Sequence, residues 1–437
     1  MAEKLAAGAF VFKSAANSPV GSVLYDEHLN LTDKSHIAEF AGYLMPLWYS
    51  SIAEEHSAVR QRAGVFDCTH MGVLEAAGPN AESFLDAVTT NNVRTLQVGS
   101  AHYSYLLDAV GNVLDDIIIY RREKEKFMVV VNASNEPKVK AYLAALFTGS
   151  YLTAENAEKA PNFMLGVLTP RINLGAYQAV IVRDMRDIKA GPDCRVDIAI
   201  QGPASPEILT KLTDSKTISQ IKSLKSFTFI EGKVADINCI IATTGYTGAK
   251  VCFELFVHPK DAAKLWQKVI EAGALPCGLG SRDSLRVEAG LPLYGHELDG
   301  PYNISPFEAG YGWAVKLDKE FFIGKAAMEK ISKTYKMKVA RLELPGEKGV
   351  RPVRQNDAVI SEGLCAGWVL SSATAGTRQI AIVYMDRDVA IEGNSVDIYY
   401  LARSESQKNK GKKEAVEKGE RIIGDITGKV VSRFEKF

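Results

Sequence analysis

The sequence predicts an α+β protein of several domains, and three observations support this prediction. The chain has 437 residues, a length typical of two to four domains. Between residues 64 and 132, short β-branched runs typical of strands alternate with short helical patterns. After Lys325, a short helical stretch precedes a final third that is rich in strand-like runs and glycine-marked turns. We therefore expect mixed helices and strands, followed by a β-rich C-terminal domain.

The individual elements follow from local signals. A helix over residues 51–62 should begin at Ser51, whose hydroxyl is a good N-cap, with Glu54 and Glu55 in the first turns. Apolar periodicity predicts further helices after residue 80 and over 262–272 and 280–289. Strands are expected over residues 113–120, 178–182 and within 227–256.

Composition restricts the class of protein. Lysine plus arginine and aspartate plus glutamate number 52 each, so no excess charge favours binding to nucleic acid or to an anionic membrane. The six cysteines include no Cys-x-x-Cys pair, which argues against a zinc or iron–sulfur site and for a reducing compartment. No apolar run approaches the roughly 20 residues that span a bilayer. We expect a cytoplasmic protein without a bound metal.

The most informative local feature is a pair of adjacent carboxylates, Asp115 and Asp116, inside the apolar run of residues 113–120. Side chains alternate between the two faces of a strand, so these carboxylates must point in opposite directions. A carboxylate inside such a strand must be hydrogen-bonded, be paired or face a cavity, because an isolated buried charge is very costly. A strand-end aspartate that closes a turn is the alternative interpretation.

Other polar residues also interrupt apolar or glycine-rich segments. Glu254 lies in an apolar strand, shortly after the glycine-rich turn at 244–248, and Arg282 stands in the first turn of a predicted helix. Arg282 opposes the helix dipole there, so it forms either an ion pair with Glu254 or a clamp for a ligand. Aromatic residues could stack on a flat ligand, although each one is individually more typical of a core: Tyr103, Tyr120, Tyr246 and Trp313. The histidines show no metal spacing, and His70 and His296 are expected to be structural.

Several of these segments resemble one known family. In order along the chain, the matching motifs are EEHSAVR at 54–60, GVFDCTHMG at 64–72, VLDD at 113–116, VNASN at 131–135, QGP at 201–203, TGYTG at 244–248, GLGSRDSLRVEAG at 278–290, and LYG at 293–295 through PFE at 306–308. Together they are similar to the aminomethyltransferases, the T-proteins of glycine cleavage. The resemblance covers roughly residues 24–330 and, more loosely, the C-terminal third.

The resemblance implies a three-domain cloverleaf around a central hole that holds tetrahydrofolate. On this basis we expect a discontinuous folate-binding domain over 24–70 and 160–258, and a discontinuous α+β domain over 71–159 and 259–310. Residues 311–437 should form a C-terminal β-barrel or jelly-roll-like domain.

The resemblance also implies site residues. Asp116, the second carboxylate of the pair, matches the family's catalytic aspartate and is expected beside the reactive nitrogens of the pteridine. Glu254 matches the glutamate that binds the edge of the pterin ring, and Arg282 matches an arginine that contacts folate. The remaining cofactor-binding positions are Met71, Tyr103, Tyr120, Asn132 and Tyr246.

In the family's reaction, a one-carbon unit passes from an aminomethyl-lipoyl carrier, the glycine cleavage H-protein, to folate N5, and ammonia is released. The enzyme must hold the folate and the lipoyl arm in line. It must also place Asp116 where positive charge develops on nitrogen.

The chain departs from the family pattern in several places. The acidic turn that usually follows TGYTG is replaced by AKVC at 249–252, and the glycine pair before the aspartates is Gly111-Asn112. About thirty extra residues lie between 148 and 197, and SSATAG at 371–376 replaces a Ser-Gly-x-x-Ser-Pro run. No residue could be matched to the family's C-terminal folate-contacting arginine.

These departures motivate two alternatives. A tetrahydrofolate-dependent O- or S-demethylase would act on a small methylated donor without a lipoyl carrier. A non-catalytic folate-binding module would resemble the iron–sulfur assembly factor of the superfamily. Cys277 stands without the signature motif of that factor, and Asp116 is retained.

Overall fold

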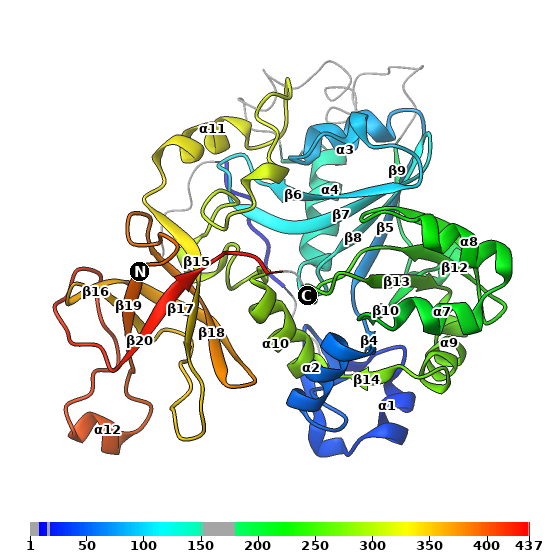
Figure 1. Ribbon diagram of the computed structural model, residues 1–437. Helices are drawn as coiled ribbons and strands as arrows, with labels where there is room; N and C mark the ends of the chain where they lie inside the picture. The colour runs from blue at the N-terminus through cyan, green and yellow to red at the C-terminus, as the bar shows by residue number, and fades with distance from the viewer. Residues whose placement is uncertain (1–7, 15–17, 149, 152–179, 436) are drawn as a thin grey trace.

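The computed structural model describes residues 8–14, 18–148, 150–151, 180–435 and 437. Three lobes, each built on its own sheet, meet around helix α10 (Leu279–Ala289), which contacts α2 (Ile52–Gln61) of the first lobe and strands of the barrel (Figure 1). The predicted α+β class and the cloverleaf arrangement are confirmed.

The first lobe, mostly green in Figure 1 with β4 in blue, contains a six-stranded sheet in the order β11-β12-β13-β10-β4-β14. Helices α7 (Ser205–Leu212), α8 (Ser215–Ser223) and α9 (Pro259–Glu271) pack their apolar faces on this sheet. A small three-stranded sheet and α1 (Tyr25–Leu31) precede it in the chain. The strands of the two sheets are β1 (Val20–Gly21), β2 (Ile37–Phe40), β3 (Tyr43–Pro46), β4 (Gly64–Asp67), β10 (Val196–Gln201), β11 (Phe229–Val234), β12 (Ile237–Ala242), β13 (Cys252–Val257) and β14 (Leu275–Cys277).

The second lobe, cyan in Figure 1, is a five-stranded sheet in the order β6-β7-β8-β5-β9, covered by α3 (Ala81–Val88) and α4 (Glu136–Thr148). Its strand β7 (Val113–Glu123) pairs antiparallel with β6 over most of its length and with β8 from Ile118 onward. The other strands are β5 (Gly72–Ala77), β6 (Ser100–Leu107), β8 (Lys126–Val131) and β9 (Ile181–Asp184).

The third lobe is a closed six-stranded barrel, entered through α11 (Lys325–Thr334), and this confirms the predicted β-barrel. Its strands are β15 (Met337–Pro345), β16 (Ala358–Ser361), β17 (Leu364–Ala375), β18 (Arg378–Asp386), β19 (Ser395–Tyr399) and β20 (Ile426–Val431), and α12 (Glu405–Asn409) lies in the loop between the last two. Short 3₁₀ turns complete the described elements: η1 (Lys34–His36), η2 (Val93–Thr95), η3 (Ile188–Asp193), η4 (Gly300–Tyr302) and η5 (Gly312–Ala314).

The ends of helices α2 and α10 show the capping residues that the sequence provides for them. The Ser51 hydroxyl accepts a hydrogen bond from Glu54 N at 3.2 Å, as expected of the N-cap of α2. Helix α10 ends at Gly290, which has a left-handed φ of 79°. A β-carbon at Gly290 would lie 2.0 Å from the carbonyl oxygen of Arg433, so the chain after β20 is able to pass directly over this helix end.

The structure differs from the predicted domain limits in two segments. Strand β9 lies within the range predicted for the first domain, but it pairs with β5 in the five-stranded sheet of the second lobe. Helix α9 and strand β14 lie within the range predicted for the second domain, but α9 buries Leu265 and Trp266 against the six-stranded sheet and β14 pairs with β4. Sheet pairing between distant segments decides both memberships, and linear order does not reveal it. The predicted break at 159/160 and most of the insertion at 148–197 lie outside the described residues.

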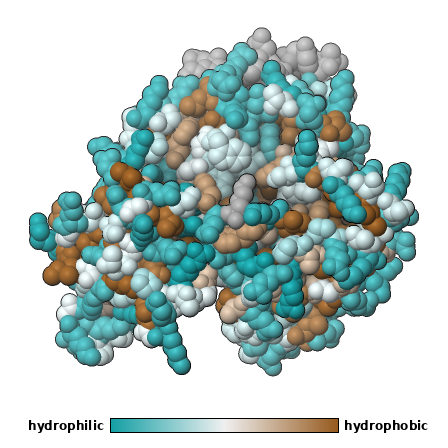
Figure 2. Space-filling model, viewed as in Figure 1, coloured by the Kyte–Doolittle hydropathy of each residue, from teal (hydrophilic) through white to brown (hydrophobic). Residues whose placement is uncertain are grey.

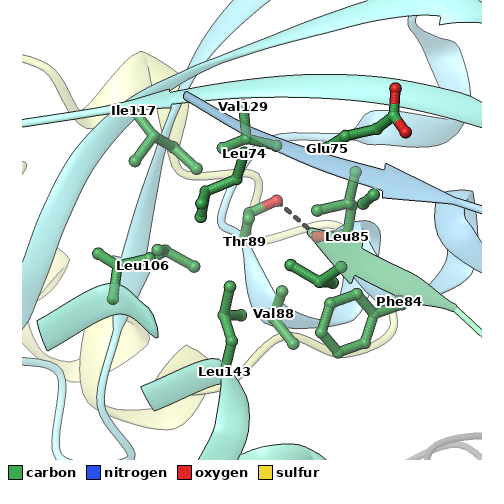
Figure 3. A pocket seen from close by; sticks show the side chains of 13 residues that line it. Leu74, Glu75, Phe84, Leu85, Val88, Thr89, Leu106, Ile117, Val129 and Leu143 are labelled. Atoms are coloured by element: carbon green, nitrogen blue, oxygen red, sulfur yellow. Dashed lines mark hydrogen bonds between the residues drawn. The ribbon is translucent and has the colours of Figure 1, made fainter. Parts of the chain in front are cut away.

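The core of the second lobe contains a small void of about 20 Å³ between α3, α4 and the sheet (Figure 3). Its lining is apolar, including Val88, Leu143 and Val129, and the carboxylate of Glu75 points away from it. The Thr89 hydroxyl donates to the carbonyl of Leu85 at 2.7 Å, which satisfies the hydroxyl in this core. A void of this size and polarity is a packing defect.

The visible surface is mostly hydrophilic, with hydrophobic residues in small scattered groups, and it is indented between the lobes (Figure 2). No helix among the described residues is long and apolar enough to cross a membrane. The cytoplasmic location stays a prediction.

Candidate functional site

A cavity of about 1380 Å³ lies where the lobes meet. One wall, which we call the β7 wall, comes from the second lobe and carries Tyr103, Asp116 and Asn132. The other, which we call the β10 wall, comes from the first lobe and α10 and carries His70, Asp197, Glu254 and Arg282. Trp313 and the segment after β20, with Phe434 and Glu435, also line the cavity.

The two carboxylates of the pair have different surroundings. Asp116 lines the cavity, whereas the Asp115 side chain is fully buried and is not part of the lining. Asp115 accepts hydrogen bonds from Asn132 N at 3.0 Å, Asn132 Nδ2 at 2.8 Å and Asn135 Nδ2 at 2.6 Å. The expectation that a carboxylate in this strand is either paired or directed into a cavity is therefore met by both members.

Asn132 connects the two carboxylates. Its Nδ2 lies 2.8 Å from Asp115 Oδ1 and also 2.8 Å from Asp116 Oδ1, while the Tyr103 hydroxyl donates to Asp116 Oδ2 at 2.9 Å. Burial raises the pKa of both carboxyls, the neighbouring Asp116 raises that of Asp115 further, and these hydrogen bonds oppose the change. Asp116 is thus held in one orientation and is easier to protonate than an exposed aspartate.

Aromatic rings stand next to Asp116. The Tyr103 ring lies 5.3 Å from that of Tyr311 and 6.0 Å from that of Trp313, measured between centroids. Trp313 remains 52% exposed, although it belongs to this cluster. An exposed indole beside a cavity provides a flat face for an aromatic ligand.

Glu254 lies on β13 of the opposite wall. Its Oε2 accepts hydrogen bonds from the hydroxyls of Tyr120 (3.1 Å) and Thr244. Tyr120 itself differs from its predicted place, because its ring is fully buried and is not part of the cavity lining. Tyr120 lies four residues after Asp116 on β7, so the two side chains are expected on the same face of the strand. At Tyr120, however, the two sheets pack together, and its ring contacts those of Phe229 and Phe256. Tyr120 therefore contacts the site through Glu254 and Thr244, which both line the cavity.

The glycine-rich turn at 244–248 brings Tyr246 to the cavity. A β-carbon at Gly245 would lie 2.3 Å from Gln201 Oε1, and Thr247 donates to the same oxygen at 2.9 Å. Gln201 belongs to the QGP motif at 201–203, so this motif holds the glycine-rich turn in place. The C-terminal Phe437 adds two backbone hydrogen bonds, to Gly248 and Lys250, across the altered turn.

Arg282 enters the cavity from the first turn of α10, with its guanidinium 5.1 Å from the centre of the Tyr246 ring. In the described part of the chain it forms no ion pair, so the structural pair with Glu254 is not made, and its Nη1 is buried without a hydrogen-bond partner. Burial lowers the pKa of Arg282, but the nearby acidic groups, Glu254 among them, outweigh this and the net pKa is raised. A charged, unpaired guanidinium is available to a ligand.

The remaining predicted residue, Met71, also lines the cavity, but sequence reasoning missed part of this wall. His70 and Asp197 line it as well, and His70 Nδ1 and Asp197 Oδ1 are buried without partners among the described residues. The signal for Asp197 was present, because it interrupts an apolar strand as Asp115 does. No group of three or more potential ligands for a metal ion occurs in the described ranges.

Three lobes around a cavity lined by carboxylates, an arginine and aromatic rings define a protein of the cloverleaf class with a central polar and aromatic site. The sequence model described as "GCVT N-terminal domain" matches residues 24–167 and 178–319. The chain is 39% identical over 390 residues to an aminomethyltransferase of Streptomyces avermitilis, covering 87% of this chain and 93% of the relative. It is 35% identical over 359 residues to that of Exiguobacterium sibiricum, covering 82% and 87%.

A solved structure agrees with these sequence relatives. The glycine cleavage system aminomethyltransferase T from Bartonella henselae superposes with a TM-score of 0.71 and 26% identity, covering 94% of this chain and 96% of that one. The chain belongs to the glycine cleavage T-protein, or aminomethyltransferase, family, and it is a one-carbon transferase.

Proposed function

We propose that this protein is a tetrahydrofolate-dependent aminomethyltransferase, which moves a one-carbon unit from an aminomethyl-lipoyl carrier protein to folate N5 and releases ammonia. The observation that carries the proposal is that Asp116, held by Tyr103 and Asn132, lines the same cavity as Glu254 and Arg282. A polar heterocycle on the β10 wall would have its reacting nitrogen near Asp116.

The residues of the cavity suit this ligand. Its volume exceeds the roughly 300–1,000 Å³ of ordinary ligand pockets, which leaves room for a folate and the end of a carrier arm. Arg282 Nη1 is a buried donor without a partner in the described chain, and a ligand acceptor would satisfy it. The rings of Tyr103 and Trp313 offer flat faces to a pteridine.

The chemical role of the protein is then positioning and electrostatics. Tyr103 and Asn132 fix the Asp116 carboxylate before a ligand arrives, so no reorganisation is needed when positive charge develops on nitrogen. Because burial raises its pKa, Asp116 is also suited to accept and return a proton during the transfer. The lipoyl carrier, the H-protein of glycine cleavage, is the proposed partner, and the walls hold both reactants together.

The test is to incubate the protein with tetrahydrofolate and an aminomethylated lipoyl carrier, and to measure methylene-tetrahydrofolate and ammonia. We expect both products in equal amounts, and none with an unloaded carrier. Parallel reactions without a carrier, using methoxy or methylsulfonium donors, test the demethylase alternative through methylated folate. Folate binding without turnover in any reaction would favour the non-catalytic module and overturn the proposal.

A further inference from the structure

Strand β10 carries a carboxyl group with no described partner for one of its oxygens. All six residues of β10 are buried, and Val196, Ile198 and Ile200 face the apolar core of the first lobe. Asp197, which points to the other face, is 3% exposed and lines the cavity. Its Oδ1 has no hydrogen-bond partner among the described residues, and the residue makes no ion pair there.

The register of the sheet places this carboxyl beside Glu254. Strands β10 and β13 are antiparallel, with Ala199 opposite Glu254 and Asp197 opposite Phe256. Asp197 and Glu254 therefore share one face of the sheet as diagonal neighbours, a separation that longer side chains bridge. Both lie on the wall that Arg282 completes.

An unpaired carboxyl in this place costs the ligand-free protein stability. Leaving a buried acceptor without a partner is destabilising, and more so if the acceptor is charged. Burial raises the pKa of Asp197 well above its ordinary value, Glu254 raises it further, and Arg282 only partly opposes this. An apolar side chain would suit the strand better, so the carboxyl has no structural reason to be there.

Glu254 has too few free hydrogen-bond acceptors for the edge of a pterin, and Asp197 is able to supply another. Its Oε2 is already engaged by Tyr120 and Thr244, and only Oε1 is without a described hydrogen bond. The 2-amino-4-oxopyrimidine edge of a pterin presents a ring N–H and an amino group with two hydrogens. One free oxygen cannot accept from all of these donors, because they are spread along the edge of the ring.

We propose that Asp197 is a second carboxyl anchor for the pterin, which accepts a hydrogen bond from the 2-amino edge of the ring and, with Glu254, selects ligands that carry this amino group. This inference rests on the proposed function, because it takes tetrahydrofolate as the ligand. Asp197 acts in binding, so its loss raises the KM for tetrahydrofolate more than it lowers kcat.

The experiment compares the wild-type protein with Asp197→Leu, using calorimetric titration with tetrahydrofolate and with its analogue that has a methyl group in place of the 2-amino group. We expect Asp197→Leu to bind tetrahydrofolate about 10- to 100-fold more weakly, as for a buried hydrogen bond that loses one of its partners. We also expect it to lose most of the wild-type preference for tetrahydrofolate over the analogue.

A matched control separates ligand binding from folding. Asp67 on the neighbouring strand β4 is also buried, but its carboxylate accepts hydrogen bonds from Ser22 (2.6 Å) and Thr69 N (2.7 Å) and contacts His28 Nε2 at 2.7 Å. Asp67→Leu should lower the melting temperature of the ligand-free protein, whereas Asp197→Leu should keep or raise it. A purely structural role for Asp197 predicts a lower melting temperature in both variants.

The outcomes are distinguishable. If the wild type binds tetrahydrofolate and Asp197→Leu binds it equally well, or keeps the full preference over the analogue, the inference is overturned and the proposed function is untouched. If the wild type does not bind tetrahydrofolate, both are overturned.

Discussion

Asp116 on β7 and Asp197 on β10 are both strand carboxylates that line the cavity, but their surroundings differ. The Asp116 carboxylate receives hydrogen bonds from Tyr103 and Asn132, so its orientation is fixed in the absence of a ligand. On the β10 wall, Asp197, His70 and Arg282 each keep a buried polar atom without a described partner.

This difference separates two kinds of functional residue. A group that must act in a transition state benefits from partners that hold it in place beforehand. A group that must recognise a ligand keeps its hydrogen-bonding capacity free, at the expense of stability in the ligand-free protein. The apolar void in the second lobe (Figure 3) serves as a control region, because its lining has no role expected in catalysis or in ligand recognition.

The largest effect is expected on the β7 wall, from Asp116→Asn. The amide keeps the size of the side chain but removes its charge, and the rate of transfer should fall by about a hundredfold or more, as for the loss of a preorganised polar group. Folate binding should be partly retained, because Glu254 and Arg282 are unchanged. Single-turnover formation of methylene-tetrahydrofolate measures the rate, and turnover equal to that of the wild type would refute the role of Asp116.

His70 on the β10 wall is buried, and its Nδ1 has no described hydrogen-bond partner. We therefore expect the stability of the folded protein to depend on pH through the titration of His70. Burial lowers the pKa of His70 to about 4, against about 6.5 when exposed, and Arg282 lowers it as well, while Asp67 opposes the change. Between these values the unfolded chain binds a proton that the folded protein does not, so stability is complete above pH 6.5 and is lost as the pH falls toward 4. The contribution is about 3 kcal/mol over the full range.

His70→Gln removes this titration. The loss of melting temperature between pH 7 and pH 5 should therefore be smaller in the variant than in the wild type, when both are followed by circular dichroism. Equal losses in the two proteins would show that His70 is not buried in its neutral form.

Asn132 and Asn135 offer a comparison within the β7 wall. Asn132 bridges both carboxylates, whereas the side chain of Asn135 contacts Asp115 at 2.6 Å. Each alanine variant should lose about 2 kcal/mol of stability, because a buried carboxylate loses a donor. Only Asn132→Ala should also reduce the transfer rate, by about tenfold, since it frees Asp116. Equal rate losses in the two variants would contradict the bridging role.

The smallest effect is expected in the apolar void. Val88→Ile adds one methylene where about 20 Å³ is empty, so the free energy of unfolding should change by less than about 1 kcal/mol in either direction. Urea unfolding measures this change. Tetrahydrofolate binding and transfer should be unaffected, and a change in either would mean that this core is coupled to the cavity.

The sequence alone was sufficient to predict features that depend on neighbouring residues or on the order of motifs. Strand alternation predicted different surroundings for Asp115 and Asp116, and the Ser51 cap marked the start of α2. The order of the motifs identified the family. Resemblance to the family also led to Met71, Tyr103, Asn132, Tyr246, Glu254 and Arg282, all of which line one cavity. Their individual roles stay predictions that the variants above would test.

Tertiary structure decided what depends on the pairing of distant segments. Strand pairing places β9, and also α9 and β14, in other lobes than the linear order predicts. Packing buries the Tyr120 ring next to Glu254, and it places Asp197 and His70 in the lining of the cavity. The physical reason is that a strand's neighbours, and thus the partners of its polar groups, are fixed by long-range hydrogen bonding and packing. A sequence reveals that a carboxylate interrupts a strand, but only the assembled sheet reveals whether another part of the chain satisfies it.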